Sequence, residues 1–364
     1  MDFNLSPEEA YFQRSCRDFL ERACPPEIAR ELAAGEDGER TGRLRRELAT
    51  GGWNELAIAA ASGDATAFVN LGLFSLEGGR VLLPGFYRSA ALVALAVGLA
   101  GTEPQRDRYL ALLAGGLAAA APAEPPRARL SLQTSGSRVL ASGRQPLLAN
   151  AGSAELLLLF AGSGESLVGV LVPAGAAGVG LRRLPALGGE PVFEVTLEAV
   201  ELPAGAVLDP GARGAAKDAW ERWFDQALAL LSLELAGGAR KVVELTAEYV
   251  KQRHQFGRPL GAFQAVQHHL ANMLIDADGA HAAAVQALWA AAHGRPAARE
   301  TSTAKLWAGR AYRSNTVLAH QLHGGAGYVR EADLHLYSER ALAGSVSLGT
   351  REDHLRRLWA AGRD

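Results

Sequence analysis

The chain has 364 residues, of which 48% are apolar, and this is enough for a sizeable core divided between two or three domains. A formal net charge of −2 supplies no attraction for nucleic acid or an anionic membrane, so small metabolites and other proteins are the expected ligands. The two cysteines, Cys16 and Cys24, lie eight residues apart and are poorly placed for a disulfide. This cysteine usage favours a reduced, cytoplasmic setting.

The sequence shows no segment suited to export or membrane insertion. Its first ten residues, MDFNLSPEEA, are acidic and lack the apolar core of a signal peptide. The longest apolar run, around residues 90–101, is too short to cross a bilayer. We therefore expect a soluble cytoplasmic protein without membrane insertion.

The first predicted element is a helix that begins at Ser6. Ser6 is a typical N-cap, Pro7 suits the first helical position, and Glu9 completes a capping box. This helix is expected to reach about Ala23, and helical periodicity recurs further along the chain. Residues 1–120 are therefore predicted to form an N-terminal helical domain, which is more typical of a packing scaffold than of a chemical site.

The character of the chain changes after Pro122. Short runs at residues 156–160, 168–172 and 193–202 alternate or are bounded by glycine and proline, which favours strands. A small middle β-domain is predicted over residues 121–210.

The chain is predicted to be helical again from Lys217 to its end. Helix breaks are expected at residues 257–259, 294–296 and 324–327 and at Gly344. The long helices between these breaks indicate a C-terminal bundle over residues 211–364. The predicted fold class is thus α+β, with an N-terminal helical domain, a middle β-domain and a C-terminal four-helix bundle.

All nine histidines follow residue 250, but their spacing does not favour a metal site. His268 and His269 are adjacent and point to different sides of a helix. His320 and His323 lack a carboxylate at ligand spacing. We therefore predict that the chain binds no metal.

The most informative stretch is residues 249–269, YVKQRHQFGRPLGAFQAVQHH. Gly257 and Pro259 end one helix, and a second begins near Phe263, so the stretch forms a polar, aromatic corner. Its candidate binding residues are Arg253, Gln255, Phe256, Phe263 and Gln264.

A second stretch, HQLHGGAGY at residues 320–328, is predicted to end another helix. It carries Gln321, and Gly324 and Gly325 allow left-handed torsions and close approach of a ligand to the backbone. Arginine donors for phosphate, glutamine amides and a flat phenylalanine ring together suit a dinucleotide. The alternative from these residues alone is an ordinary helix corner with a surface arginine and a C-cap glycine.

The order and spacing of these residues resemble the acyl-CoA dehydrogenase family. In that family an R-x-x-F-G segment, an F-Q pair ten residues after the arginine, and a Q-x-x-G-G segment contact FAD. The resemblance implies that the chain holds the ADP half of an FAD bound mainly by a neighbouring subunit. The residues implied are Arg253, Gln255, Phe256, Phe263, Gln264, Gln321, Gly324 and Gly325.

The middle domain departs from the family's pattern. The segment Ala123-Glu124-Pro125 resembles the start of the family's flavin-contacting loop, but residues 126–129, PRAR, replace its glycines and small hydroxylated residue. No tryptophan lies in residues 122–208, although family members commonly place one beside the flavin ring. The chain's own half of a flavin site is therefore expected to be eroded.

The family's catalytic base is also missing. The resemblance implies a glutamate directly before a Gly-Thr pair, and here Leu348 precedes Gly349 and Thr350. The family's alternative glutamate position falls on Ala227, and Leu228 replaces a nearby arginine. Other carboxylates in the neighbourhood are more typical of solvated or capping groups, namely Glu331, Asp333, Glu352 and Asp353. No catalytic residue is assigned to the chain.

Residues 327–344, GYVREADLHLYSERALAG, resemble a bacterial subset of the family that includes subunits of heteromeric enzymes acting on steroid side-chain thioesters. The resemblance implies an FAD-dependent acyl-CoA dehydrogenase in which this chain is paired with a second, complete subunit, as a heterotetramer. An acyl-CoA substrate and an electron-transfer acceptor would be its other partners. Two alternatives stay open: a structural or regulatory paralogue without flavin, and a self-sufficient homo-oligomer with a relocated base.

Overall fold

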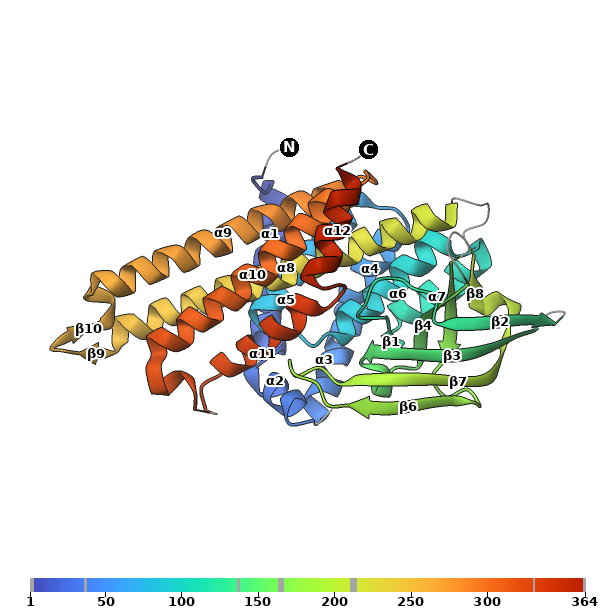
Figure 1. Cartoon of the computed structure of the whole chain (residues 1–364), viewed down its shortest axis with the longest axis horizontal. Helices are drawn as coiled ribbons and strands as arrows, with labels where there is room; N and C mark the ends of the chain where they lie inside the picture. The colour runs from blue at the N-terminus through green and yellow to red at the C-terminus, as the bar shows by residue number, and fades with distance from the viewer. Residues whose placement is uncertain are drawn as a thin grey trace.

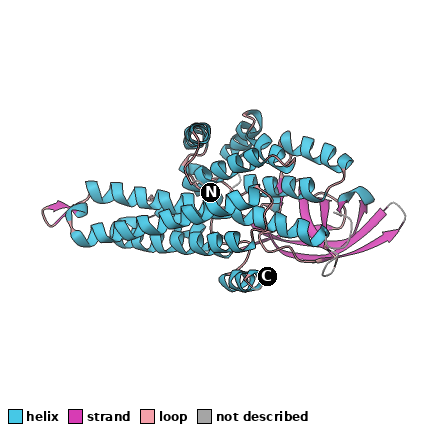
Figure 2. Ribbon diagram, turned by 90° about the horizontal axis from the view of Figure 1, so that it is seen from above, coloured by secondary structure: helices cyan, strands magenta, loops and turns pink. Residues whose placement is uncertain are grey.

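The computed structural model describes residues 3–35, 38–135, 138–162, 167–209, 215–329 and 331–362. Figure 1 shows an elongated molecule with a β-sheet at one end, a long helical arm at the other, and the N-terminal helices between them. Seen from above in Figure 2, the arm and the sheet again lie at opposite ends. The α+β fold class is confirmed, whereas the domain boundaries at residues 120 and 210 stay predictions.

The N-terminal part is helical. The capping box is confirmed, because Ser6 Oγ accepts from the Glu9 backbone N–H at 3.2 Å and the Glu9 carboxylate accepts from the Ser6 N–H at 2.7 Å. Its helices are α1 (Pro7–Ala23), α2 (Pro26–Ala33), α3 (Glu39–Thr50), α4 (Trp53–Ala61), α5 (Ala65–Arg80), α6 (Phe86–Ala100) and α7 (Glu103–Ala114).

The middle part forms one sheet, in the order β6-β7-β3-β2-β4-β5-β8, with β1 beside β4. Its strands are β1 (Ala119–Ala120), β2 (Leu130–Ser135), β3 (Arg138–Ala149), β4 (Leu156–Ala161), β5 (Val168–Pro173), β6 (Val179–Leu184), β7 (Val192–Pro203) and β8 (Val207–Leu208). Strand β4 is apolar throughout because both of its faces are buried. Leu157 and Leu159 point into the core of the sheet, whereas Leu158 and Phe160 join the core of the helices.

The C-terminal part consists of long helices and one short hairpin. Its elements are α8 (Ala215–Gln252), β9 (His254–Gln255), β10 (Arg258–Pro259), α9 (Gln264–Ala292), α10 (Ala298–His323), α11 (Leu334–Val346) and α12 (Arg351–Ala361). The expected corner after α8 is present and contains a short hairpin. One expectation was wrong: Gly344 lies inside α11, where its missing β-carbon lets Leu235 of α8 pack against the backbone.

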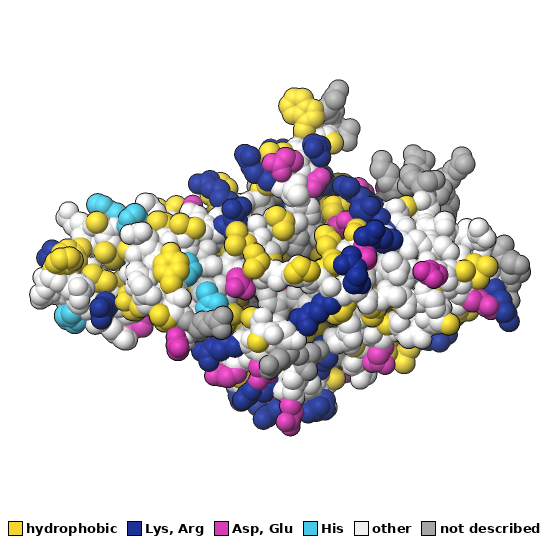
Figure 3. Space-filling model, turned by 60° about the horizontal axis from the view of Figure 1, so that its bottom comes forward, with side chains coloured by type: hydrophobic (Ala, Val, Ile, Leu, Met, Phe, Trp, Pro, Cys, Tyr) yellow, Lys and Arg dark blue, Asp and Glu magenta, His cyan; other side chains and the backbone are white. Residues whose placement is uncertain are grey.

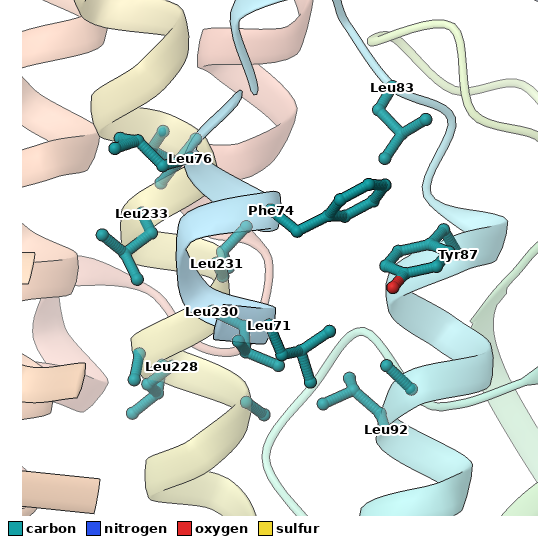
Figure 4. Packing of buried hydrophobic residues seen from close by; sticks show 14 of the residues in the cluster. Leu71, Phe74, Leu76, Leu83, Tyr87, Leu92, Leu228, Leu230, Leu231 and Leu233 are labelled. Atoms are coloured by element: carbon teal, nitrogen blue, oxygen red, sulfur yellow. The ribbon is translucent and has the colours of Figure 1, made fainter. Parts of the chain in front are cut away.

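The main core lies where α5 and α6 pack on α8. Leucines of α5 and α8 interdigitate here, with Phe74 and Tyr87 on one side, as Figure 4 shows. A β-carbon on Gly79 would overlap the backbone of α8, and one on Gly237 would overlap that of α5. Glycine at both positions therefore permits the close approach of the two helices.

A buried ion network connects all three parts of the chain. Arg340 of α11 lies 2.6 Å from Glu190 of the loop between β6 and β7, and 3.3 Å from Glu234 of α8. Arg88 of α6 is ion-paired with both of these glutamates. Because each buried charge has an opposite charge beside it, the network holds sheet and helices in a set orientation.

Within the described ranges, no helix is long and apolar enough to cross a membrane. The same residues contain no group of three or more histidine, cysteine or acidic side chains arranged to hold a metal ion.

Candidate functional site

The hairpin at the end of the arm presents a strained aromatic residue. Gln255 pairs with Arg258, so Phe256 and Gly257 form a two-residue turn, and their φ angles of 55° and 79° indicate type I′. Asparagine or glycine is usual at the first of these positions, and a bulky residue there stores backbone strain. The Phe256 side chain is 89% exposed. The hairpin therefore holds a flat apolar ring away from the core of its own chain.

The other predicted residues of the first stretch lie close to this ring. Phe263 is the N-cap residue of α9, and its ring meets that of Phe256 edge to face, with centroids 6.1 Å apart. The Arg258 guanidinium lies 4.0 Å from the centroid of the Phe263 ring, in a contact that sequence analysis missed because nothing distinguishes Arg258 from a surface arginine. Gln264 is the exposed first residue of α9.

Arg253 lies at the base of the hairpin. Its backbone N–H donates to the Tyr249 carbonyl at 2.9 Å, and its carbonyl accepts from the Leu260 N–H at 2.8 Å. Its side chain is exposed and, among the residues that the structure describes, has neither an ion-pair nor a hydrogen-bond partner. The guanidinium donors are thus free for a ligand.

The second stretch ends α10 in a tight turn over Gly324–Gly327. Gly324 has φ 59° and ψ −142°, a combination reserved for glycine. Gly325 has no such requirement, and a β-carbon on either glycine would meet no atom within 4 Å. Packing within the chain therefore does not explain Gly325. The backbone here is open to a ligand, with the exposed Gln321 beside it.

The fold brings the two stretches to the same end of the arm. Tyr249 of α8 stacks on His323 of α10, with ring centroids 4.2 Å apart, and its hydroxyl donates to the His323 carbonyl at 3.2 Å. We call the eight predicted residues around this contact the arm-tip cluster: Arg253, Gln255, Phe256, Phe263, Gln264, Gln321, Gly324 and Gly325. Free donors, an exposed ring and open glycine backbone fit the ADP half of a dinucleotide, and their exposure fits half of a site.

The loop predicted to have lost its flavin contacts is closed by its own side chains. The Glu124 carboxylate accepts from Arg129 at 3.0 and 3.2 Å and from the Gln145 amide at 2.8 Å. Gln145 is only 1% exposed. The side chains of Glu124, Arg129 and Gln145 are therefore paired within the chain, and the exposed Arg127 lies 3.8 Å from Asp353.

The turn that would carry the family's base packs against this loop. Leu348 is 1% exposed, has φ 57°, and its N–H donates to the Ala123 carbonyl at 2.7 Å. Gly349 also has positive φ, and Thr350 caps α12 with a capping box. We call this contact between residues 123–129 and 347–350 the loop–turn contact. It buries an apolar side chain at the position where the family resemblance implies a glutamate.

Two ionisable groups behind the turn are buried. Burial lowers the pKa of Lys305 to about 7, with Arg88 contributing, and its Nζ donates to the Ser345 carbonyl at 2.9 Å. Burial also lowers the pKa of His354 to about 4, assisted by Lys305 and Arg357. Neither group faces the solvent, so both support the turn rather than offer chemistry at it.

The alternative base position is equally apolar. Ala227 and Leu228 are completely buried on α8. Nearby, burial raises the pKa of Asp225, although Arg357 at 2.8 Å and the Thr301 hydroxyl at 2.7 Å oppose that shift and occupy the carboxylate. Asp225 is therefore held in a structural contact.

The remaining carboxylates have ordinary surroundings. Asp333 accepts from Arg30 at 2.7 and 3.0 Å, and Asp353 belongs to the capping box of α12. Glu331 and Glu352 are exposed. None of these four carboxylates lies in the water-poor pocket that a general base requires.

The comparisons agree with the class of protein that this fold and this site define. The acyl-CoA dehydrogenase N-terminal domain model matches residues 6–116, and the acyl-CoA dehydrogenase C-terminal domain model matches residues 217–362. The chain therefore belongs to the acyl-CoA dehydrogenase family, a family of flavoprotein oxidoreductases acting on CH–CH groups. Residues 117–216, between the two matches, hold the sheet and the closed loop.

Three similar proteins cover nearly the whole chain. A probable acyl-CoA dehydrogenase of Bacillus subtilis (strain 168), YngJ, is 25% identical over 372 residues, 97% of each chain. The solved Tcur3481-Tcur3483 steroid ACAD variant has a TM-score of 0.85 at 27% identity, covering 98% of both chains. The ChsE4-ChsE5 complex from Mycobacterium tuberculosis has a TM-score of 0.88 at 23% identity, covering 100% of this chain and 99% of that one, and it supports the fold.

Proposed function

We propose that this chain is a subunit of a hetero-oligomeric, FAD-dependent acyl-CoA dehydrogenase and that it contributes FAD contacts across a subunit interface. The observation that carries the proposal is the contrast between its two half-sites. The arm-tip cluster leaves binding groups free, whereas the loop–turn contact has closed on itself and contains no base. Half of a nucleotide site is useful only when a second subunit supplies the other half.

The roles of the arm-tip residues follow from their chemistry. Arg253 would bind the phosphates of the ADP half through its paired guanidinium donors. The rings of Phe256 and Phe263 would cover the adenosine, and Gln255, Gln264 and the exposed Gln321 would hydrogen-bond to its polar edges. The open backbone of Gly324 and Gly325 would let the ligand approach closely.

The dehydrogenation itself would occur on the partner's side of the interface. Bound FAD supplies the acceptor for the hydride that leaves the β-carbon of an acyl-CoA. Leu348 and Ala227 offer no group to take the α-proton, so the base would be the partner's. An electron-transfer acceptor would then reoxidise the flavin.

A two-chain assembly is supported by the surface of the arm and by related structures. Figure 3 shows hydrophobic side chains and histidines exposed along the arm. The most exposed apolar residues of the arm and its end turn include Phe256, Ile275, Val317 and Tyr328, each at least 66% exposed. Two of the similar solved structures carry paired subunit names, and one is described as a steroid enzyme. We propose a heterotetramer, with steroid-type acyl-CoA thioesters as the first substrates to test.

The test measures the visible absorbance of flavin in this chain purified alone and after co-expression with the acyl-CoA dehydrogenase encoded nearest to it. The proposal expects flavin only in the co-expressed complex, and expects Arg253→Ala in this chain to remove it. Flavin in the lone chain would support the self-sufficient enzyme. A colourless complex would support the structural paralogue. An Arg253→Ala complex that keeps its full flavin content would contradict the proposal that this chain contributes FAD contacts across the subunit interface.

A further inference from the structure

We infer that Tyr249 and His323 are positioning residues that set the spacing between the two halves of the arm-tip cluster. This inference rests on the proposed function and deepens it. The two residues lie 74 positions apart in the chain, on different helices, and their contact joins the hairpin side of the cluster to the glycine side.

The contact reaches the backbone at the point where α10 ends and the glycine turn begins. His323 is the last residue of α10 and the N-cap residue of the 3₁₀ turn over Gly324–Gly327, so its carbonyl lies where the helix passes into the glycine turn. The Tyr249 hydroxyl donates to this carbonyl at 3.2 Å. The left-handed φ of Gly324 therefore coincides with a hydrogen bond from another helix, and the start of the turn is tied to α8.

The His323 side chain packs against the glycine turn over Gly324–Gly327. Its Nδ1 lies 2.8 Å from the Ala319 carbonyl, which fixes the ring on α10, and one face of that ring stacks on Tyr249. Gly327 is buried against the His323 side chain, since a β-carbon there would lie 3.0 Å from His323 Cβ. The turn over Gly324–Gly327 consequently rests on a histidine that Tyr249 holds in place.

The same tyrosine holds the hairpin side. Its carbonyl accepts from the Arg253 N–H at 2.9 Å, and the Arg253 carbonyl accepts from the Leu260 N–H at 2.8 Å. A shift of Tyr249 would therefore move the base of the hairpin relative to the glycine turn. A ligand that contacts both sides binds best when this spacing is already correct, because less ordering is needed on binding.

The polar atoms that make this contact are already used within the chain. The Tyr249 hydroxyl and His323 Nδ1 are both engaged within the chain. Burial lowers the pKa of His323, with its bond to the Ala319 carbonyl opposing, so the stacked ring is uncharged at neutral pH. Their role would therefore be expressed through the geometry of the cluster.

The test uses the co-expressed complex and two variants of this chain. Tyr249→Phe removes one oxygen and keeps the stacked ring, whereas His323→Ala removes the ring. The measurements are the dissociation constants for FAD and for ADP as a competitor, together with the absorbance spectrum of the bound flavin. We expect both dissociation constants to rise. The rise should be about threefold for Tyr249→Phe, which loses one hydrogen bond, and about tenfold or more for His323→Ala, which also loses the stacked ring. The shape of the flavin spectrum should not change, because the ring system lies in the partner.

A matched control exists at the opposite end of α9. Trp289 and His293 also pack ring to ring, with centroids 4.6 Å apart, and His293 Nδ1 lies 2.8 Å from the Trp289 carbonyl. His293→Ala should leave both dissociation constants unchanged. An equal loss of affinity in this control would show general destabilisation and overturn the positioning role.

The remaining outcomes separate this inference from the proposed function. If Arg253→Ala loses flavin while Tyr249→Phe and His323→Ala bind FAD and ADP as tightly as the wild type, the positioning role is overturned and the proposed function stands. If Arg253→Ala keeps its flavin, the proposed function itself fails. Should His323→Ala not fold, Tyr249→Phe decides, because it preserves the packing.

Discussion

The arm-tip cluster and the loop–turn contact differ in whether their polar side chains have partners within the chain. At the arm tip the Arg253 side chain faces solvent without a partner among the described residues, and two glycines leave the backbone open. At the loop–turn contact Glu124 is bonded by Arg129 and Gln145, and Leu348 is sealed beneath the loop. A site kept for a ligand leaves binding capacity unused in the free chain, whereas a site without a ligand is closed by ordinary packing.

The largest effect is expected from returning a carboxylate to the loop–turn contact. Leu348→Glu would bury an acid at a position that is 1% exposed and holds an apolar side chain, which should destabilise the chain by several kcal/mol at neutral pH and restore no activity. Burial would raise the pKa of this acid above its unfolded value. Stability would then be lost as pH rises from the unfolded pKa to the folded one. Denaturant unfolding at about pH 4.5 and pH 7.5 measures the difference, with Leu348→Met as the control.

A catalytically active Leu348→Glu chain, purified without its partner, would contradict this contrast. It would mean that the closed loop can reopen around a substrate. The loop–turn contact would then be a site that can still admit a substrate, and not one that the chain's own side chains occupy permanently.

The next effect concerns the glycine that packing does not explain. Gly325→Val should lower the flavin content of the complex strongly, because its side chain would occupy the open space over the turn. The thermal unfolding temperature of the lone chain should change by only a few degrees, since no atom of the chain lies within 4 Å of the new β-carbon. Gly79→Val is the opposite control, and it should destabilise the chain because it overlaps α8.

Replacing Phe256 should change the stability of the free chain and FAD binding by the complex in opposite directions. Phe256→Asn relieves the strained position of the type I′ turn and should stabilise the free chain by about 1 kcal/mol. The same change removes the exposed ring and should weaken FAD binding in the complex. Thermal unfolding and FAD titration measure the two effects, and a loss of both stability and affinity would argue that the ring supports the hairpin rather than a ligand.

The smallest effect is the pH dependence that Lys305 contributes. Burial lowers its pKa to about 7, below its value of about 10.4 in an unfolded chain, so the unfolded state binds more protons between these limits. The wild type should therefore gain stability as pH rises from 7 towards 10. Lys305→Met should flatten this slope in urea unfolding measured across that range, and an unchanged slope would show that the amine is solvated.

Local signals in the sequence predicted much of this molecule. The capping box at Ser6, the apolar run of β4 and the helix start at Gln264 depend on neighbouring residues, and all three are confirmed. The eight residues of the arm-tip cluster were also chosen from short motifs, and their role stays a proposal. These features could be read because their interactions involve residues close together in the chain.

Other features depend on contacts between distant parts of the chain. Nothing near Gly344 indicates that Leu235 packs against it, and a helix break was wrongly expected there. The pairing of Tyr249 with His323, and the closure of Glu124 by Gln145, likewise require the helices and the sheet to be in place first. Sequence motifs thus named the groups available for binding. Long-range packing selected which of them are left open and which are used up inside the chain.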